Sequence, residues 1–218
     1  MGLGALLWKD ARRELRRKEG MQAGLVLVLT FLLLDLFAFP TLEGMPDAAA
    51  VALWTPLLFG AAALTLRGFA AEADLGTLDL LRGLPSPLGS HGWSRTILNL
   101  LLLGILAGLT VGAAAALFAL PLSVPLLATL ALAVAGLATV GTLASAIAAQ
   151  ARSREMLLPL LMVPVLAPLL QAGVAATMDA LQGATTGDLR VHLLLMAGYD
   201  ILAVGAAWLL WPVVLEGD

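Results

Sequence analysis

The sequence contains no cysteine and only two lysines and two histidines in 218 residues. Without cysteine there is no disulfide, no thiolate metal site, no haem attached through a Cys-x-x-Cys-His motif and no cysteine nucleophile. The lysines, Lys9 and Lys18, do not belong to a glycine-rich phosphate loop, so the chain has no ATP-binding P-loop of its own. His91 and His192 lie far apart, and no His-Glu-x-x-His motif is present. These absences predict a protein that is not itself an enzyme.

Charge is also scarce. Only 12% of the residues are charged and 61% are hydrophobic, whereas an average soluble domain carries about a quarter charged residues. This composition predicts a protein that crosses the lipid bilayer several times. The chain starts with about 20 basic, amphipathic residues rather than a short basic region followed at once by an apolar one, so no cleavable signal peptide is expected. Nothing in the composition indicates nucleic-acid binding.

Six segments are long and apolar enough to span a membrane, for which about 20 residues are needed. They are residues 21–40, 47–67, 94–119, 124–149, 155–178 and 191–214, separated by short breaks that contain proline or glycine. The predicted fold is therefore all-α, with one six-helix transmembrane domain over residues 21–218.

Residues 1–20 have leucines at helical spacing on one side and several arginines on the other. This pattern predicts an amphipathic helix that lies in the membrane interface with its cations near anionic headgroups. The alternative is a basic tail that only fixes the topology. If the N-terminus is cytoplasmic, every lysine and arginine except Arg190 falls on the inner side. This distribution predicts that both termini are cytoplasmic.

Residues 67–93 form the longest polar break in the chain. Leucines alternate there with Glu72, Asp74 and Asp79 in helical order, and Pro85 and Pro87 end the pattern. We expect a short helix and elbow with one apolar stripe and one acidic face. Such a helix suits a cytosolic partner, because the stripe supplies affinity and the charges set register. The alternative is an ordinary surface helix between two spans.

Carboxylates within predicted spans are expensive in lipid and usually face the bundle interior or line a pathway. Asp35 lies toward the outer end of the first span, and Asp200 lies near the middle of the sixth. His192, Met196 and Tyr199 share one helical face beside Asp200. These three residue types ligate haem iron in other proteins, which makes cargo contact one interpretation. The other is an interfacial histidine and tyrosine with a packed methionine.

Prolines and glycines mark two further helices. Pro159, Pro164 and Pro168 fall in the fifth span, which makes it either a moving, cavity-lining element or a permanently bent packing helix. In the third span Gly104, Gly108 and Gly112 repeat at four-residue spacing. This repeat favours close helix packing or a dimer face.

Several of these features together resemble the CcmB family, the haem exporter permease subunit of cytochrome c maturation. The resemblance rests on the acidic, Gly76-Thr77-Leu78-Asp79 and leucine-rich loop with its Pro85-x-Pro87 end, and on the proline-rich fifth helix with its Thr177-Met178-Asp179 exit. One departure is Leu75, where the family commonly has an acidic residue. The resemblance covers nearly the whole chain.

The resemblance implies the membrane subunit of an ATP-binding-cassette exporter in the inner membrane, with ATP bound by a separate CcmA-like ATPase. It further implies a homodimer of this chain, CcmC-like and CcmD-like membrane partners, a CcmE-like periplasmic haem chaperone, and haem as cargo rather than as a resident cofactor. Residues 67–93 would be the coupling loop. Its contact set would be Glu72, Asp74, Gly76, Thr77, Leu78, Asp79, Leu81, Pro85 and Pro87.

The residues expected at a cargo path or a helix interface are less closely defined by the resemblance. They are Asp35, Pro159, Pro164, Pro168, Met178, Asp179, His192, Tyr199 and Asp200. Alternative functions are an exporter permease for another cargo, a non-transporting scaffold of the maturation complex, and a proton-coupled carrier that uses Asp35 and Asp200. No metal site is expected.

Overall fold

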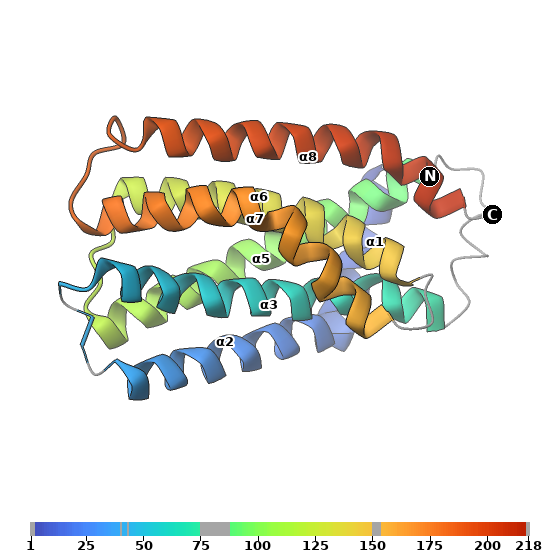
Figure 1. Cartoon of the computed structure of the whole chain (residues 1–218). Coiled ribbons are helices and arrows are strands. Elements are labelled where there is room, and N and C mark those ends of the chain that lie inside the picture. The colour runs from blue at the N-terminus through green and yellow to red at the C-terminus, as the bar shows by residue number, and fades with distance from the viewer. Residues whose placement is uncertain (1–2, 40, 43, 75–87, 150–153, 217–218) are drawn as a thin grey trace.

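The computed structural model describes residues 3–39, 41–42, 44–74, 88–149 and 154–216, with the backbone alone at 15, 17, 66–68, 70–74, 88, 154–161 and 216. All regular structure in these ranges is helical, as predicted (Figure 1). The helices are α1 (Leu3–Arg17), α2 (Glu19–Ala38), α3 (Pro46–Asp74), α5 (Leu88–Phe118), α6 (Val124–Ala149), α7 (Arg154–Leu181) and α8 (Arg190–Glu216).

Six of these helices, α2, α3 and α5 to α8, are long and apolar enough to cross a membrane, which confirms the predicted number of spans. They run side by side and give the bundle two distinct ends (Figure 1). We call the end that holds both chain termini, the last turn of α3 and the first turn of α5 the termini end. The opposite end, with the short connections 39–45, 119–123 and 182–189, is the loop end.

The polar break that the sequence places at 67–93 is shorter in the structure. α3 continues to Asp74 and α5 begins at Leu88, so both ends of the break belong to long flanking helices rather than to a separate helix. Alanine and glutamate, which favour helix, allow α3 to run beyond its apolar part. The centre of the predicted coupling helix, residues 75–87, lies outside the described residues.

The last connection is also shorter than the predicted break. α7 extends to Leu181 and is followed by Gly183 at φ 87°, a left-handed conformation that glycine adopts without steric cost. Asp188 Oδ2 then accepts hydrogen bonds from the Thr185 backbone N–H at 2.8 Å and from Thr185 Oγ1 at 2.7 Å. These bonds lower the pKa of Asp188, and they fix the turn that leads into α8.

α1 leaves the line of the other helices at Lys18, whose φ of 54° breaks the helix before α2. It runs across the termini end and packs against α5 (Figure 1). Leu6 on its inner side is buried, while Trp8 is 71% exposed. The predicted two-sided helix is therefore present. Its place in a membrane interface stays a prediction.

The centre of the bundle is α6. Seventeen of its 26 residues are buried, and it contacts α3, α5, α7 and α8. Small residues such as Gly136 and Gly141 let these helices approach closely, because an added Cβ at either position would press on a neighbouring side chain. Asn99 Nδ2 on α5 also donates to Thr142 Oγ1 on α6 at 2.9 Å.

The glycine repeat in α5 has a different environment. Gly104, Gly108 and Gly112 have no neighbour within 4 Å of an added Cβ, so they do not pack against another helix in the described part of the chain. They line an apolar groove of about 500 Å³ between α5 and α6. Close packing within one copy is thus not the role of this repeat, and its use as a dimer face stays a prediction.

Candidate functional site

A small aromatic cluster at the termini end joins the two helices that flank residues 75–87. Trp211 of α8 is fully buried, and its ring lies 5.9 Å from the ring of Phe69 of α3, with an interplanar angle of 31°. Ala146 of α6 and Leu215 of α8 belong to the same cluster. Phe69 lies five residues before the end of α3. The last part of α3 is therefore attached to α6 and α8.

Gly92 brings α5 into the same cluster. A Cβ at Gly92 would collide with the Trp211 ring, so only glycine leaves room for the indole at this point. Gly92 lies four residues after the start of α5. α3 and α5, the helices on either side of residues 75–87, are therefore both held against Trp211. This arrangement did not follow from the sequence, because Phe69, Gly92 and Trp211 are far apart along the chain. We call Phe69, Gly92, Ala146, Trp211 and Leu215 the Trp211 cluster.

The predicted coupling residues divide between two regions. Glu72 and Asp74 belong to the last turn of α3, next to the Trp211 cluster, with only their backbone described. The others lie outside the described residues, so their predicted contacts stay predictions. They are Gly76, Thr77, Leu78, Asp79, Leu81, Pro85 and Pro87.

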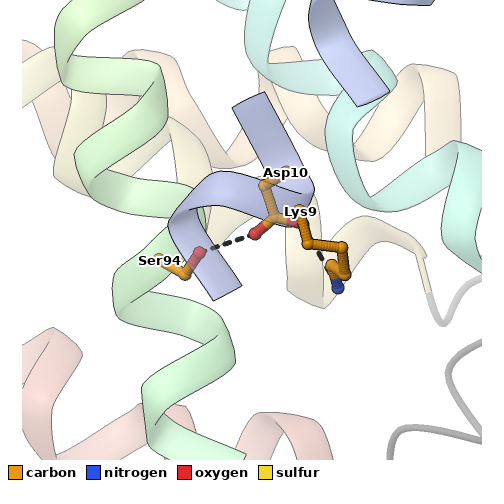
Figure 2. Close-up of polar contacts among 3 residues, drawn as sticks. All are labelled: Lys9, Asp10 and Ser94. Carbon is orange, nitrogen blue, oxygen red and sulfur yellow. Dashed lines mark hydrogen bonds and ion pairs between the residues drawn. The ribbon is translucent and has the colours of Figure 1, made fainter. Parts of the chain in front are cut away.

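A buried polar contact that the sequence did not indicate joins α1 to α5. Asp10 is 3% exposed, and its Oδ2 accepts a hydrogen bond of 2.6 Å from Ser94 Oγ (Figure 2). Lys9 Nζ forms an ion pair with Asp10 Oδ1 at 3.2 Å. Asp10 stands in a basic, amphipathic segment, where an acidic residue would ordinarily be assigned to the solvated face. The contact fixes α1 beside the first turns of α5.

At the loop end the structure brings two predicted residues together. Asp179 in the last turn of α7 and His192 in the first turn of α8 form a pair, with His192 Nε2 3.4 Å from Asp179 Oδ2. Both side chains are partly exposed, and Met178 beside them is half-buried. Met196, by contrast, is completely buried and packs near Gly173 of α7. The interpretation of Met196 as a packed methionine is therefore confirmed.

The proline-rich helix is tied to α8 through Tyr199. The Tyr199 hydroxyl donates a hydrogen bond of 2.9 Å to the carbonyl oxygen of Val165. Val165 lies between Pro164 and Pro168, both exposed, and the α7 ribbon bends along its length (Figure 1). Pro159 lies earlier in the same helix, with only its backbone described. Each proline removes a backbone donor, which accounts for the bend.

Thr177 of the Thr-Met-Asp exit has a packing role. Its Oγ1 accepts a 3.0 Å hydrogen bond from Trp54 Nε1 on α3 and donates to the Gly173 carbonyl at 2.8 Å. A Cβ at Gly173 would collide with the Trp54 ring. The exit of α7 is therefore locked to α3 by an indole, a hydroxyl and a glycine.

The two predicted intramembrane carboxylates lie apart. Asp200 faces α6, where its Oδ1 would be 2.6 Å from a Cβ at Gly136. Both of its carboxyl oxygens are buried without a hydrogen-bond partner, and Asp35 Oδ2 on α2 is in the same condition. Since α2 and α8 occupy opposite sides of the bundle (Figure 1), Asp35 and Asp200 do not form one paired site. Among the described residues, no group of three acidic or histidine side chains is placed to hold a metal ion.

Comparison with known proteins gives the family. A family model described as CcmB protein matches residues 1–212, which is almost the entire chain. The chain belongs to the CcmB family. No curated protein matches it.

Membership of the CcmB family gives the six-span bundle a biological setting. The protein is a membrane permease component of the haem exporter for cytochrome c maturation, a multi-pass protein of the inner membrane. A permease subunit of this kind is generally not an enzyme and belongs to a Ccm complex with partner ABC components. The resemblance seen in the loop and in the proline-rich helix is thereby confirmed.

Proposed function

We propose that this CcmB-family permease receives conformational work from a separate ATPase through residues 67–93 at the termini end. The observation that carries this proposal is the Trp211 cluster. The two helices that flank residues 75–87, α3 and α5, meet at one buried indole through Phe69 and Gly92. A force on that segment therefore acts on α3, α5 and α8 at the same time.

Close packing is what makes such a connection effective. Protein interiors are nearly as dense as organic crystals, so a displacement of one packed group moves its neighbours instead of being absorbed. Trp211 has no exposed surface and cannot yield by swinging into lipid or water. A shift of the α3 and α5 ends is expected to become a shift of α8, the helix that carries Tyr199 and Asp200.

The proposal extends to the assembly around the chain. Two copies of the permease pair with two CcmA-like ATPases, and CcmC-like and CcmD-like subunits join them. The positive-inside pattern favours a cytoplasmic termini end, on the side of the membrane where ATP is available. Haem is the cargo or the group whose delivery to a CcmE-like periplasmic chaperone is driven. On this proposal Glu72, Asp74 and Asp79 set the register of the ATPase, and the leucines of the same segment supply its apolar contact.

The test is a triple charge reversal, Glu72→Lys, Asp74→Lys and Asp79→Lys, in the intact complex. We expect the ATPase to be lost from the purified complex while the permease still inserts and folds, because the changes lie at the polar end of the bundle. A matched control adds three lysines at the loop end, at the exposed residues Asp47, Gln182 and Thr186. Unchanged co-purification of the ATPase with the triple variant would rule out this docking surface.

A second arm separates transport from scaffolding and haem from other cargo. An ATPase variant that binds but does not hydrolyse ATP is combined with the unaltered permease, and holo-cytochromes c are measured by haem staining. We expect c-type cytochromes to disappear with no change in drug sensitivity. Continued maturation without hydrolysis would instead support a passive scaffold.

A further inference from the structure

Arg95 is the one lysine or arginine whose side chain is buried, at 5% exposure, among those that the structure describes. Its Nε and Nη1 atoms are enclosed and have no hydrogen-bond partner in the described part of the chain. A buried, unpaired guanidinium costs several kcal/mol. The observation therefore calls for an anionic group that binds Arg95.

The residues next to Arg95 along α5 reach the corner between α1 and α5. Ser94, the preceding residue, donates to Asp10 of α1, and His91, one helical turn earlier, lies within electrostatic reach of Lys9 and Asp10. Figure 2 shows this corner, with Asp10 directed toward Ser94. Asp10 Oδ2 accepts from Ser94, Asp10 Oδ1 is ion-paired with Lys9, and no hydrogen bond or ion pair joins Asp10 to Arg95, so Asp10 does not supply the missing anion.

The depth of this corner matches the headgroup region of a membrane. From Ile97 to Phe118 α5 contains no charged residue, so Arg95 stands at the boundary of the hydrocarbon span. Trp93 is half-buried beside it, and tryptophan is typical of this boundary. On α1, Leu3 is 40% exposed and Trp8 is 71% exposed. A ligand bound here would have a cation to meet, and α1 carries exposed apolar side chains at the same end of the bundle.

We propose that Arg95 binds the phosphate of a membrane phospholipid in the corner between α1 and α5. Nη2 is the guanidinium nitrogen that is not enclosed, so it is the atom that first meets the phosphate, and an outward turn of the planar group would add a second N–H in the geometry that a phosphate accepts. The exposed apolar residues of α1 provide a surface for the acyl chains, which a free anion would not need. The bound lipid joins α1 to the bundle at the termini end, and this site is independent of the proposed coupling to an ATPase.

The first experiment measures thermal unfolding of the purified full-length chain in a phosphate-free, non-ionic detergent. Three probes are added separately: dioleoylphosphatidylglycerol, a galactosyl diacylglycerol with the same acyl chains, and inorganic phosphate. We expect only the phospholipid to raise the unfolding temperature of the unaltered chain. In Arg95→Met the apparent affinity for phospholipid should fall roughly tenfold to a hundredfold, as expected for loss of charge-assisted hydrogen bonds. Arg190→Met, which removes an exposed arginine at the loop end, is the matched control.

A second comparison distinguishes lipid binding from a general loss of stability, because the order of the two unfolding temperatures should reverse when lipid is added. Without lipid, Arg95→Met should melt at a higher temperature than the unaltered chain, because it replaces an unpaired buried charge with an apolar side chain of similar length. With phosphatidylglycerol present, the unaltered chain should melt higher. Arg95→Lys, which keeps the charge without the fork, should retain part of the lipid response.

Three results would overturn the proposal. If Arg95→Met melts below the unaltered chain in both conditions and responds equally to lipid, Arg95 has a purely structural role. If inorganic phosphate gives the same stabilisation as phospholipid, the ligand is a soluble anion. If Arg95→Met keeps its lipid response but loses the ATPase during purification, the partner of Arg95 is a protein carboxylate.

Discussion

Glycines at single positions have two opposite uses in this chain. Gly92 and Gly173 each lie beneath a tryptophan ring, where a side chain would collide with the indole. Gly104, Gly108 and Gly112 face open space. The regular spacing of the second group predicted close helix packing or a dimer face, whereas the first group has no local pattern in the sequence. Spacing along one helix cannot show what lies opposite each glycine, because that is set by another helix.

Gly92→Ala adds one methyl group against the Trp211 ring and so tests how closely the Trp211 cluster is packed. The new Cβ must displace the fully buried Trp211 ring, and overpacking of this kind typically costs about 1–3 kcal/mol. We expect a clearly lower unfolding temperature for the variant in detergent, measured by tryptophan fluorescence. Gly104→Ala, in open space on the same helix, should stay within about 0.5 kcal/mol of the unaltered chain. Equal stability of the two variants would mean that the indole does not fill the space above Gly92.

At the scale of the element, α7 shows how an irregular helix is held. Its prolines bend it, and α8 contacts the bent part through Tyr199 while α3 holds its exit through Trp54 and Thr177. The three prolines in the sequence predicted that this helix is bent. It did not predict that the Tyr199 hydroxyl would meet a backbone oxygen of the kinked part, because a tyrosine at helical spacing from His192 equally suits an interfacial position.

Tyr199→Phe removes this connection between α7 and α8 and keeps the aromatic ring. Hydrogen bonds between membrane helices average about 0.6 kcal/mol, so we expect a small loss of stability together with faster hydrogen exchange in the first half of α7. Thr30→Val is the control, since the Thr30 hydroxyl bonds only to the Val26 carbonyl of its own helix. Exchange in α7 that is the same in both variants would show that Tyr199 does not restrain the bend.

The bounds of the elements were predictable where hydrophobicity changes sharply. The start of α6 was predicted at its observed residue, since a proline-bearing break precedes a long apolar run there. α3 and α5 both extend further toward the 75–87 segment than predicted, to Asp74 and from Leu88. The length of an apolar run reflects the thickness of the membrane, whereas a helix ends where its backbone hydrogen bonds end. At a polar surface the helix can therefore continue beyond the end of the apolar run.

At the scale of the whole molecule, the two ends of the bundle differ in charge. Of the lysines and arginines that the structure describes, all but Arg190 lie toward the termini end, and Arg190 begins α8 at the loop end. The positive-inside rule therefore predicts that the termini end is cytoplasmic. In this predicted orientation the Trp211 cluster and Arg95 would lie on the cytoplasmic side, and the Asp179–His192 pair would lie on the periplasmic side, to which the proposed function delivers haem.

The absence of native cysteine makes this orientation directly testable. Thr186→Cys at the loop end and Gly4→Cys on α1 introduce single thiols at exposed positions. A membrane-impermeant maleimide should label Thr186→Cys in intact cells and label Gly4→Cys only after the inner membrane is opened. The unaltered chain is the blank. Labelling of Gly4→Cys in intact cells, with Thr186→Cys protected, would reverse the topology and remove the cytoplasmic coupling surface.

The sequence by itself determined that this is a membrane protein and that six of its helices are long enough to span the bilayer, because a span needs a long apolar run and the chain has six of them. It also determined the family, through a loop and a proline-rich helix whose residues are contiguous. Only the tertiary structure decided that Trp211 joins α3 to α5, that Asp179 meets His192, and that Arg95 lies buried without a partner among the described residues. These features depend on which faces of different helices meet, and in a nearly uniformly apolar sequence that choice is set by side-chain shape and packing rather than by hydrophobic pattern.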